Sequence, residues 1–462
     1  MVVRVLAMKA FLLIVFCLFG INISLAEQSD HQLVVKLDED YQQLAGDIYL
    51  AQGHRAGLIN DLDFLRSEYQ KDISQGNLAK ANGILLANLK LFPTQPDNAL
   101  VVSFVDDLLQ HNERQLAETI YGRIEAANES GDFSYLNFIF AKYYARQRDW
   151  PQVNQLLPQI SINLTGEDAD YAYLLQGLSR QFLKQHRQSI ESYDAISETS
   201  AYFVHARLNT ALANIRQGWT TEAQSIITKL IPVSRSRENT ELTNRMFVVL
   251  GYALLQQEFF RDARDAFRNV ESDSVHTNRA LFGIALSAIS LGDLETGLNA
   301  VNLLKQRESD DLSRDEAYLL LPYIYERLDQ RQSIEDSFSA AINHYQARIL
   351  ELEALKNLPL DYSQIHLEDT GRLILREQEF DFSNQHPPYL LTNRRNLGQL
   401  SSEINDAEFS LRIDRLIEQY DQLLNEIVIS LIDQQIAYLN SYLNQARYGL
   451  ARHYDYQNRD LK

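Results

Sequence analysis

The clearest hydrophobic pattern lies near the C-terminus, where apolar residues alternate steps of four and three in two blocks. Between residues 400 and 456 only Gly449 interrupts the helix-forming residues. This spacing is the heptad seam of a coiled coil, and it predicts a long C-terminal helix or helical hairpin over 400–457, with a phase slip between the blocks. The stripe consists of Ile413, Ile417, Tyr420, Leu424, Ile427, Leu431, Ile436, Leu439, Leu443, Ala446 and Leu450.

This stripe has two interpretations. The helix can dock on another protein or on a second copy of the chain, which would make the protein a homo-oligomer. It can equally fold back as a cap on the preceding helices, because a repeat protein must hide its open end. An antiparallel fold-back uses the same apolar stripe, so both interpretations stay open.

A second pattern repeats through the middle of the chain. Small residues recur with spacings of 36, 34, 40 and 34, and each is followed twelve residues later by a second small or medium residue and four residues after that by a larger one. A fixed period in this range predicts stacked helix pairs in place of a globular bundle. The first small residues are Ala141, Gly177, Ala211, Gly251 and Ala285; the second positions are Val153, Ser189, Ala223, Ala263 and Gly297; the large ones are Leu157, Tyr193, Ile227, Phe267 and Val301.

These positions resemble the signature of the tetratricopeptide repeat family, as found in exported proteins of Gram-negative bacteria. Pro93 and Pro232 fit the proline that often closes a repeat, although the usual leading tryptophan is missing. The resemblance implies an all-α fold: a right-handed TPR-like α-solenoid over 57–345, followed by the long C-terminal helix with coiled-coil character. Weaker units around Tyr69, Val105 and Pro322 bring the expected number to about eight repeats, and the 40-residue spacing implies an inserted turn within 234–239.

The solenoid is flanked by two further segments. Residues 27–56 are expected to form an N-terminal helix or cap. Residues 346–399 begin as helix and then meet Pro359, Gly371 and the pair Pro387-Pro388. Such breakers predict an irregular linker or hairpin before the C-terminal helix.

The N-terminus has the features of a signal peptide over residues 1–26. Arg4 and Lys9 precede an apolar run, and Ser24-Leu25-Ala26 supplies the small residues that a signal peptidase reads, with cleavage expected after Ala26. A retained membrane anchor would need about 20 apolar residues, and Asn22 interrupts the run before that length. We therefore expect a periplasmic protein, soluble or peripheral to a membrane.

Charge and cysteine content narrow the function. The net charge is −19, and loss of Arg4 and Lys9 with the signal peptide makes it −21. Nucleic-acid binding depends on Lys and Arg neutralising phosphates, so no nucleic-acid partner is expected. The single cysteine, Cys17, lies within the signal peptide, so the mature chain has no disulfide and no thiolate for catalysis or metal binding.

The resemblance also implies a concave surface lined by the first helix of each pair. Arginine binds carboxylates through paired, charge-assisted hydrogen bonds. We therefore expect this groove to capture an acidic segment or a free C-terminal carboxylate of a partner protein. Its candidate residues are Tyr135, Lys142, Arg146, Tyr171, Gln181, His205, Arg216, Arg245, Gln256 and Arg279, among apolar Phe138, Leu178, Leu212 and Phe282.

Catalytic signatures are missing from the sequence. It contains no His-Glu-x-x-His metalloprotease motif, no Gly-x-Ser-x-Gly elbow and no phosphate-binding loop, and its histidines lack ligand spacing. We expect no catalytic residues, metal or cofactor, and no enzyme activity. The favoured function is a periplasmic scaffold or adaptor in an envelope transport, secretion or assembly system; the alternative is a glycan-binding accessory protein of polysaccharide export.

Overall fold

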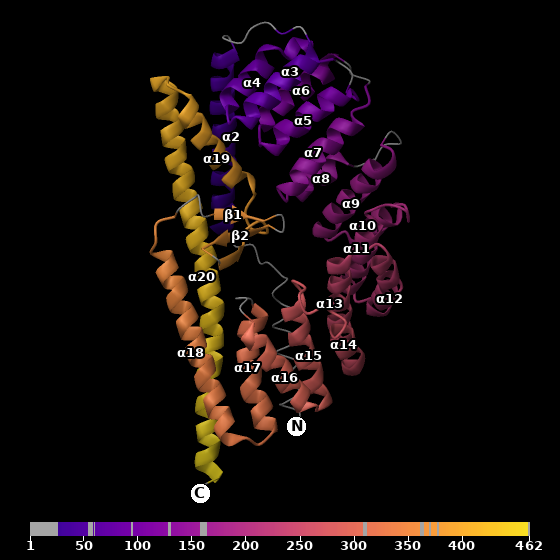
Figure 1. The fold of residues 1–462 in the computed structure, drawn as a ribbon, viewed down its shortest axis with the longest axis vertical. Helices are drawn as coiled ribbons and strands as arrows, with labels where there is room; N and C mark the ends of the chain where they lie inside the picture. The colour runs from indigo at the N-terminus through magenta and orange to yellow at the C-terminus, as the bar shows by residue number, and fades with distance from the viewer. Residues whose placement is uncertain are drawn as a thin grey trace. The chain divides into compact units, whose positions relative to one another are not determined.

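The computed structural model describes residues 26–53, 59, 61–93, 96–127, 131–157, 164–307, 312–360, 365–368, 371–376 and 378–460. The predicted signal peptide lies outside this range except for Ala26, which begins the first described helix. Within the described residues no helix is both long and apolar enough to cross a membrane. The chain divides into two compact units: unit 1 comprises residues up to Asn88 together with Tyr389–Asp421, and unit 2 comprises Leu89–Pro388 and the chain from Gln422 (Figure 1).

Unit 1 is built from segments far apart in the sequence. Its helices are α2 (Ala26–Gly53), α3 (Leu62–Ser74), α4 (Leu78–Ala87), α19 (Tyr389–Glu403) and the first part of α20 (Ala407–Asp460). Helix α3 begins at an N-cap, Asp61, whose carboxylate accepts the backbone N–H groups of Asp63 and Phe64. Helix α4 lacks such a local cap, since Asn77 makes no side-chain cap hydrogen bond.

Polar contacts fix the register of α2, α19 and α20 in unit 1. The buried Asn393 donates from Nδ2 to Oδ1 of Asp38 and to the hydroxyl of Tyr420, each at 2.9 Å. The Tyr420 hydroxyl in turn donates to the carbonyl oxygen of Leu37 at 3.0 Å. Asn396 donates to the hydroxyl of Tyr41 at 2.8 Å. Because these partners are buried, each hydrogen bond specifies which residues face one another.

Unit 2 consists mainly of consecutive helix pairs. After a short 3₁₀ turn, η1 (Leu89–Leu91), the chain alternates a first and a second helix joined by short turns. The pairs are α5 (Ala99–Gln110) with α6 (Arg114–Ala127), α7 (Ser134–Arg146) with α8 (Trp150–Leu156), α9 (Gly166–Phe182) with α10 (His186–Asp194), α11 (Phe203–Arg216) with α12 (Thr220–Ser236), α13 (Thr240–Gln256) with α14 (Phe260–Phe267), α15 (Thr277–Leu291) with α16 (Leu294–Gln306), and α17 (Leu312–Arg327) with α18 (Arg331–Lys356).

The predicted small and large positions form the contacts within and between these pairs. Gly177 of α9 faces the ring of Tyr193 in α10, so closely that a Cβ at position 177 would lie 2.8 Å from Cζ of the tyrosine. In α14, Phe267 fills the corresponding space, and both Gly251 and Gly283 lie against its ring. Tyr193 and Phe267 are fully buried. The small residues therefore let two first helices approach one aromatic ring from the intervening second helix.

The stack of pairs curves toward its first helices. Each first helix from α5 to α15 packs against the next first helix as well as against its own partner. Among the described residues, no comparable packing joins one second helix to the next. Closer spacing on one side of a stack bends it toward that side, so α7, α9, α11, α13 and α15 line the concave face.

The 40-residue spacing has a structural cause. Helix α12 is 17 residues long and continues to Ser236, whereas the equivalent α14 has only 8 residues. The expected insertion is therefore mainly extra helix, followed by a turn in which Glu238 adopts a left-handed φ of 58°. Pro232 lies inside α12 and does not close the repeat. The guanidinium of Arg237 fixes the longer helix by donating to the carbonyl oxygens of Glu198 and Ser200.

The predicted irregular segment contains a small antiparallel β-sheet. Strands β1 (Ile365–Leu367), β2 (Arg372–Leu375) and β3 (Gln378–Asp381) pair in sequence order, with His366 opposite Ile374 and Leu373 opposite Phe380. Leu373, Leu375 and Phe380 are buried. Three short strands with one apolar face need support from neighbouring elements to be stable, and this sheet belongs to unit 2.

In unit 2 the second part of α20 runs antiparallel to α18 (Figure 1). Lys356 at the end of α18 pairs with Asp433 at 2.7 Å, whereas Phe338 near its start lies against Gly449. Between them, the rings of Tyr345 and Tyr442 are 5.8 Å apart. Of the eleven predicted stripe residues, nine are buried; Ile417 and Leu450 are partly exposed. The stripe is therefore covered by the chain itself, as the fold-back interpretation predicts.

The predicted fold class is confirmed: the chain is an all-α repeat solenoid followed by a long C-terminal helix. Residues 407–460 form one helix and not a hairpin. The solenoid was expected to begin at residue 57. Helices α3 and α4, its first expected repeat, instead group with α2 and α19 in unit 1, and unit 2 begins after Asn88.

Candidate functional site

Three of the predicted groove residues occupy equivalent places on successive first helices. His205 in α11, Arg245 in α13 and Arg279 in α15 each lie six residues before the small residue of their repeat. All three side chains are exposed. Their equivalent places in the repeat put them in one row on the concave face.

Two further residues, His276 and Arg372, interact electrostatically with this row. The charges of Arg245, Arg279 and Arg372 all act on His276, which directly precedes α15, and the charge of Arg245 acts on His205. Arg372 belongs to β2 and is distant in sequence from the other members. We name His205, Arg245, His276, Arg279 and Arg372 the arginine cluster.

Arg245 and Arg279 are two like charges held close together. Desolvation by the surrounding helices lowers the pKa of Arg245, and the neighbouring charge of Arg279 lowers it further. Within the described part of the chain, neither guanidinium has an ion-pair or hydrogen-bond partner. Two unpaired guanidinium groups at one place create a local positive potential in a protein whose net charge is −19.

The two histidines of the cluster are less basic than free imidazole. Desolvation is the main cause of the lowered pKa of His205, and Arg245 adds to it. Desolvation also lowers the pKa of His276, where Glu241 opposes the effect and Arg279, Arg245 and Arg372 reinforce it. With an ordinary value of 6.5 lowered in both cases, the imidazoles are mainly neutral at pH 7 and can act as hydrogen-bond partners.

Two carboxylates lie near the cluster and are already engaged. Oε2 of Glu241 accepts a hydrogen bond from the hydroxyl of Ser274 at 2.8 Å. Glu379 of β3 forms an ion pair with Arg372, and both of these side chains are about half exposed. Arg245 and Arg279 therefore remain available to an external anion.

Aromatic rings continue the concave face toward α7. The ring of Tyr171 in α9 stacks on Tyr202 at 4.8 Å and meets Phe138 of α7 edge-on at 6.0 Å. Burial raises the pKa of Tyr171, as does Tyr202, while Arg146 opposes the shift. Phe138 is buried beneath Tyr171 and is not a surface contact. The stacked rings of Tyr171 and Tyr202 form an apolar surface beside the arginine cluster.

The remaining predicted groove residues do not join the cluster. Lys142 is paired with Asp106 at 3.5 Å. Arg216 acts on His186 and Tyr193 of α10, near the turn between the helices of its pair. Exposed Arg146 and Gln256 lie at the ends of their helices, and Tyr135 and the apolar Leu178 and Leu212 are half-buried.

Three predicted groove positions are wrong, because Phe138, Gln181 and Phe282 are buried. Gln181 is buried, and its Oε1 accepts the hydroxyl hydrogen of Tyr193 at 2.9 Å. It satisfies a core tyrosine, because it lies one helical turn beyond Gly177, on the side that packs against α10. Phe282 is also fully buried between neighbouring helices and cannot contact a ligand.

Sequence reasoning missed His276, Tyr202 and Arg372. His276 and Tyr202 directly precede first helices, so a scan extended by one residue upstream of each helix would have included them. Arg372 carries no such signal. Its position depends on how the β-sheet packs in unit 2, which no local spacing encodes.

Exposed aromatic side chains gather at the turns between first and second helices. Trp150 stacks on Phe182 with ring centroids 4.5 Å apart and nearly parallel planes. Phe182, Trp219 and Phe259 are 48, 43 and 51% exposed. The exposure of these three side chains makes this edge of the repeats a second candidate surface.

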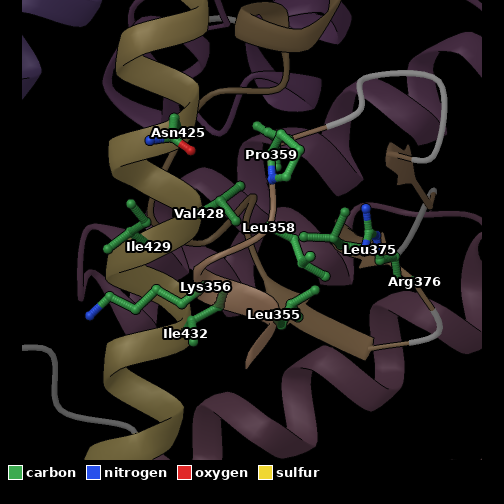
Figure 2. Close-up of a pocket in the computed structure, with 11 residues that line it drawn as sticks. Leu355, Lys356, Leu358, Pro359, Leu375, Arg376, Asn425, Val428, Ile429 and Ile432 are labelled. Atoms are coloured by element: carbon green, nitrogen blue, oxygen red, sulfur yellow. The ribbon is translucent and has the colours of Figure 1, made fainter. Parts of the chain in front are cut away.

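A pocket lies where the end of α18, the β-sheet and α20 meet in unit 2. Figure 2 shows Leu355 and Leu358 facing Val428 and Ile432 of α20, with Lys356, Arg376 and Asn425 around them. The lining is mainly aliphatic and lacks converging polar groups. Across the described residues, no group of histidine, cysteine or carboxylate side chains is arranged to hold a metal ion.

Comparisons with known proteins assign no family to this chain. No protein-family model matches the sequence, and no curated protein matches it. A tetratricopeptide repeat protein from Parabacteroides merdae has 14% identity over 63% of this chain and 99% of its own, with a TM-score of 0.35. Aspartyl phosphate phosphatase F from Bacillus subtilis has 14% identity over 82 and 93%, with a TM-score of 0.39.

A further solved structure, the apo form of the quorum sensor NprR from B. thuringiensis, has 10% identity over 70% of this chain and 97% of its own, with a TM-score of 0.37. All three TM-scores are below 0.5. The helix pairs and their packing show that the chain is an all-α helical-repeat protein.

Proposed function

We propose that this protein is an adaptor that binds a partner protein on the concave face of its repeats, through an acidic segment or a C-terminal carboxylate. The observation that supports this function is the pair Arg245 and Arg279, which occupy equivalent places on successive first helices and have no ion-pair partner among the described residues. Guanidinium groups bind carboxylates through two parallel hydrogen bonds, and like charges held together favour an anionic ligand. The apolar surface formed by Tyr171 and Tyr202 can contact an apolar side chain of the partner next to its carboxylate.

The binding experiment uses the mature chain, residues 27–462, and a labelled acidic decapeptide with a free C-terminus, titrated by fluorescence anisotropy at low and high salt. The same peptide with glutamine in place of glutamate tests the side-chain carboxylates, and a C-terminal amide tests the terminal one. Binding that weakens with salt and with glutamine substitution supports the proposal. Equal affinity for the acidic and the glutamine peptide contradicts it.

A matched pair of variants locates the binding. Arg245→Glu with Arg279→Glu reverses two charges on first helices, and we expect a loss of affinity of about 100-fold. Arg187→Glu with Arg261→Glu makes the same charge change on the second helices α10 and α14, where both arginines are exposed. If both double variants lose affinity equally, net charge and not the concave face governs binding.

The compartment is a separate part of the proposal. We infer from residues 1–26 that the chain is exported to the periplasm, where its partner belongs to an envelope transport, secretion or assembly system. N-terminal sequencing of the protein recovered from a periplasmic fraction tests this inference, and a mature start at Glu27 is expected. Recovery of the full-length chain from the cytoplasm would contradict it.

Glycan binding is a second candidate function, and the exposed Phe182, Trp219 and Phe259 favour it. Aromatic faces stack on sugar rings, and these three lie at corresponding turns of the repeats. Quenching of Trp219 fluorescence by an anionic or neutral polysaccharide, lost in Phe182→Ala with Phe259→Ala, would support this function. Retained quenching in that variant, or none in the wild type, would exclude this edge as a glycan site.

A further inference from the structure

The turns that join first to second helices share one backbone conformation from α7 to α14. The residue after each helix C-cap has a left-handed φ, which lies between 61° and 81° at Arg148, Lys184, Gly218 and Glu258. In all four turns the next residue donates its backbone N–H to the carbonyl oxygen five residues back, at 2.8–2.9 Å. Side chains at corresponding positions therefore leave the repeats along one edge. We name residues 146–150, 182–186, 216–220 and 256–260 the turn edge.

Aromatic side chains occupy the turn edge. Trp150, two residues after the left-handed position of its turn, stacks on Phe182, which stands two residues before that position in the next pair. This contact brings one turn directly against the next. Phe182 and Trp219 nevertheless remain about half exposed, so the turn edge holds aromatic surface that the fold does not bury.

Two cations lie beside these rings. Lys184 follows Phe182 by two residues and Arg216 precedes Trp219 by three, and both charged side chains are exposed. Within the described residues, neither side chain has an ion-pair or hydrogen-bond partner. Arg216 occupies the turn position that Phe182 has in the preceding pair, so it faces the turn of Lys184 as Phe182 faces Trp150.

The two middle turns are the ones without a carboxylate. Residues 182–186 and 216–220 contain no Asp or Glu, whereas Asp149 lies in the turn before them and Glu258 in the turn after them. Glu258 stands at the left-handed position that Lys184 occupies in its own turn. The local potential at the two middle turns is therefore positive in a protein whose net charge is −19, and it favours an anionic ligand there.

We propose that the two middle turns bind an acidic polysaccharide, with Phe182 and Trp219 stacking on sugar rings and Lys184 and Arg216 binding their carboxylates. This inference rests on the second candidate function, glycan binding, and names its substrate class. A uronic acid carries an apolar ring face and a carboxylate on one unit, and an aromatic ring beside a cation matches both. First helices α9 and α11 pack together, and packed helices lie about 8–10 Å apart, an interval that two linked sugars can follow.

The experiment titrates the mature chain with an oligogalacturonate and with its methyl ester, which has the same sugar rings without the charges. Isothermal titration calorimetry measures both affinities. We expect Lys184→Gln with Arg216→Gln to weaken the acidic oligomer about tenfold and to leave the ester unchanged, so that the preference for the acid is lost. Phe182→Leu should weaken both oligomers about fivefold, because both use its ring face.

A matched control removes the same charges elsewhere. Lys229 of α12 and Arg447 of α20 are exposed and lie outside the turn edge. Lys229→Gln with Arg447→Gln should change neither affinity by more than about twofold. Glu222→Gln removes an exposed carboxylate three residues beyond Trp219 and should tighten the acidic oligomer. Unchanged thermal unfolding of each variant separates ligand contact from loss of structure.

Competitors and the concave-face variant test where the acidic oligomer binds. Polyglutamate and vesicles of phosphatidylglycerol carry negative charge without sugar rings, and neither should displace the oligogalacturonate. Displacement by either would show that charge alone governs binding at the turn edge and would refute the inference. Arg245→Glu with Arg279→Glu should leave this affinity unchanged, and its loss would place the oligomer on the concave face and refute the inference too.

The outcomes separate this inference from the glycan-binding function on which it rests. Equal affinity for the oligogalacturonate and its methyl ester, with both lost in Phe182→Ala with Phe259→Ala, would refute the acidic class and leave glycan binding standing. If the wild-type chain binds neither oligomer, the inference falls.

Discussion

The ring of Tyr193 packs directly on the backbone of Gly177, where any side chain at position 177 would overlap it. This contact joins the two helices of one repeat, and its equivalents at Gly251 and Gly283 use Phe267. The periodic small residues are therefore sites of close approach and not sites of flexibility. Their substitution tests the repeat register directly.

Gly177→Ala is expected to lower the free energy of unfolding by about 1–3 kcal/mol, because the buried tyrosine cannot move without disturbing its neighbours. Gly122→Ala is the control, since Gly122 lies in α6 with open space at its Cβ position. Alanine is the better helix former there, so this variant should gain about 0.5–1 kcal/mol. Urea unfolding followed by circular dichroism compares them, and equal effects of the two substitutions would contradict the observed packing.

Asn393→Ala is expected to destabilise unit 1 by about 1–3 kcal/mol, because it removes one buried hydrogen bond to Asp38 and one to Tyr420. Asn384→Ala provides the comparison: Asn384 also donates to a carboxylate, that of Asp381 at 2.8 Å, but it is exposed to water. Its loss should change stability by less than about 0.5 kcal/mol. Thermal unfolding of the two variants measures the difference, and similar losses would show that burial does not set the cost.

Glu403 supplies a cap that the sequence around α4 lacks. Its carboxylate accepts the backbone N–H groups of Leu78 at 2.7 Å and Ala79 at 2.9 Å. Burial raises the pKa of Glu403 above 4.5, although these hydrogen bonds oppose the shift. The folded state then holds this proton more tightly than the unfolded chain, so the stabilising contribution is fully present below about pH 4.5 and is lost as pH rises through the raised pKa.

Replacement with glutamine removes this titration. The stability difference between wild type and Glu403→Gln should therefore shift against the wild type as pH rises from about 4 to 7. Glu408→Gln, at the exposed start of α20, should show a smaller pH dependence. Urea midpoints at several pH values provide the measurement, and parallel curves for all three proteins would contradict the raised pKa.

Gly449→Ala is expected to loosen the end of α20, because a Cβ there would overlap the ring of Phe338 in α18. Gly398→Ala in α19 meets only Nη1 of Arg394 at 3.6 Å and should be tolerated. Hydrogen exchange over residues 431–453 should become faster in the first variant alone. Unchanged exchange would show that α18 does not hold this part of α20.

Because the apolar stripe of α20 is buried, deleting this helix cannot test whether it binds a partner. Tyr420 and Tyr442 are core residues of unit 1 and unit 2, so truncation near residue 395 would expose both cores and produce non-specific binding. Point variants on exposed positions are the appropriate probes of partner binding by this helix. Sedimentation of the intact chain is expected to show a monomer. A dimer would show that the chain self-associates through a surface other than the buried stripe of α20.

The sequence by itself determined the helix pairs and most of the row on the concave face. The spacing of Gly177, Gly251 and their equivalents fixes which helices approach closely, because only small residues permit that contact. The same register placed His205, Arg245 and Arg279 together, since equivalent positions of a repeat point the same way. The heptad spacing also gave the correct buried face of α20.

Only the tertiary structure decided what those faces meet. Heptad spacing describes one helix surface and says nothing about its partner, so the docking of α20 on α18 had to be seen. Gln181 was misplaced because its partner, the Tyr193 hydroxyl, belongs to another helix. Arg372 and Glu403 act on residues far away in the sequence, His276 and Leu78, and such contacts arise from chain folding, not from local periodicity.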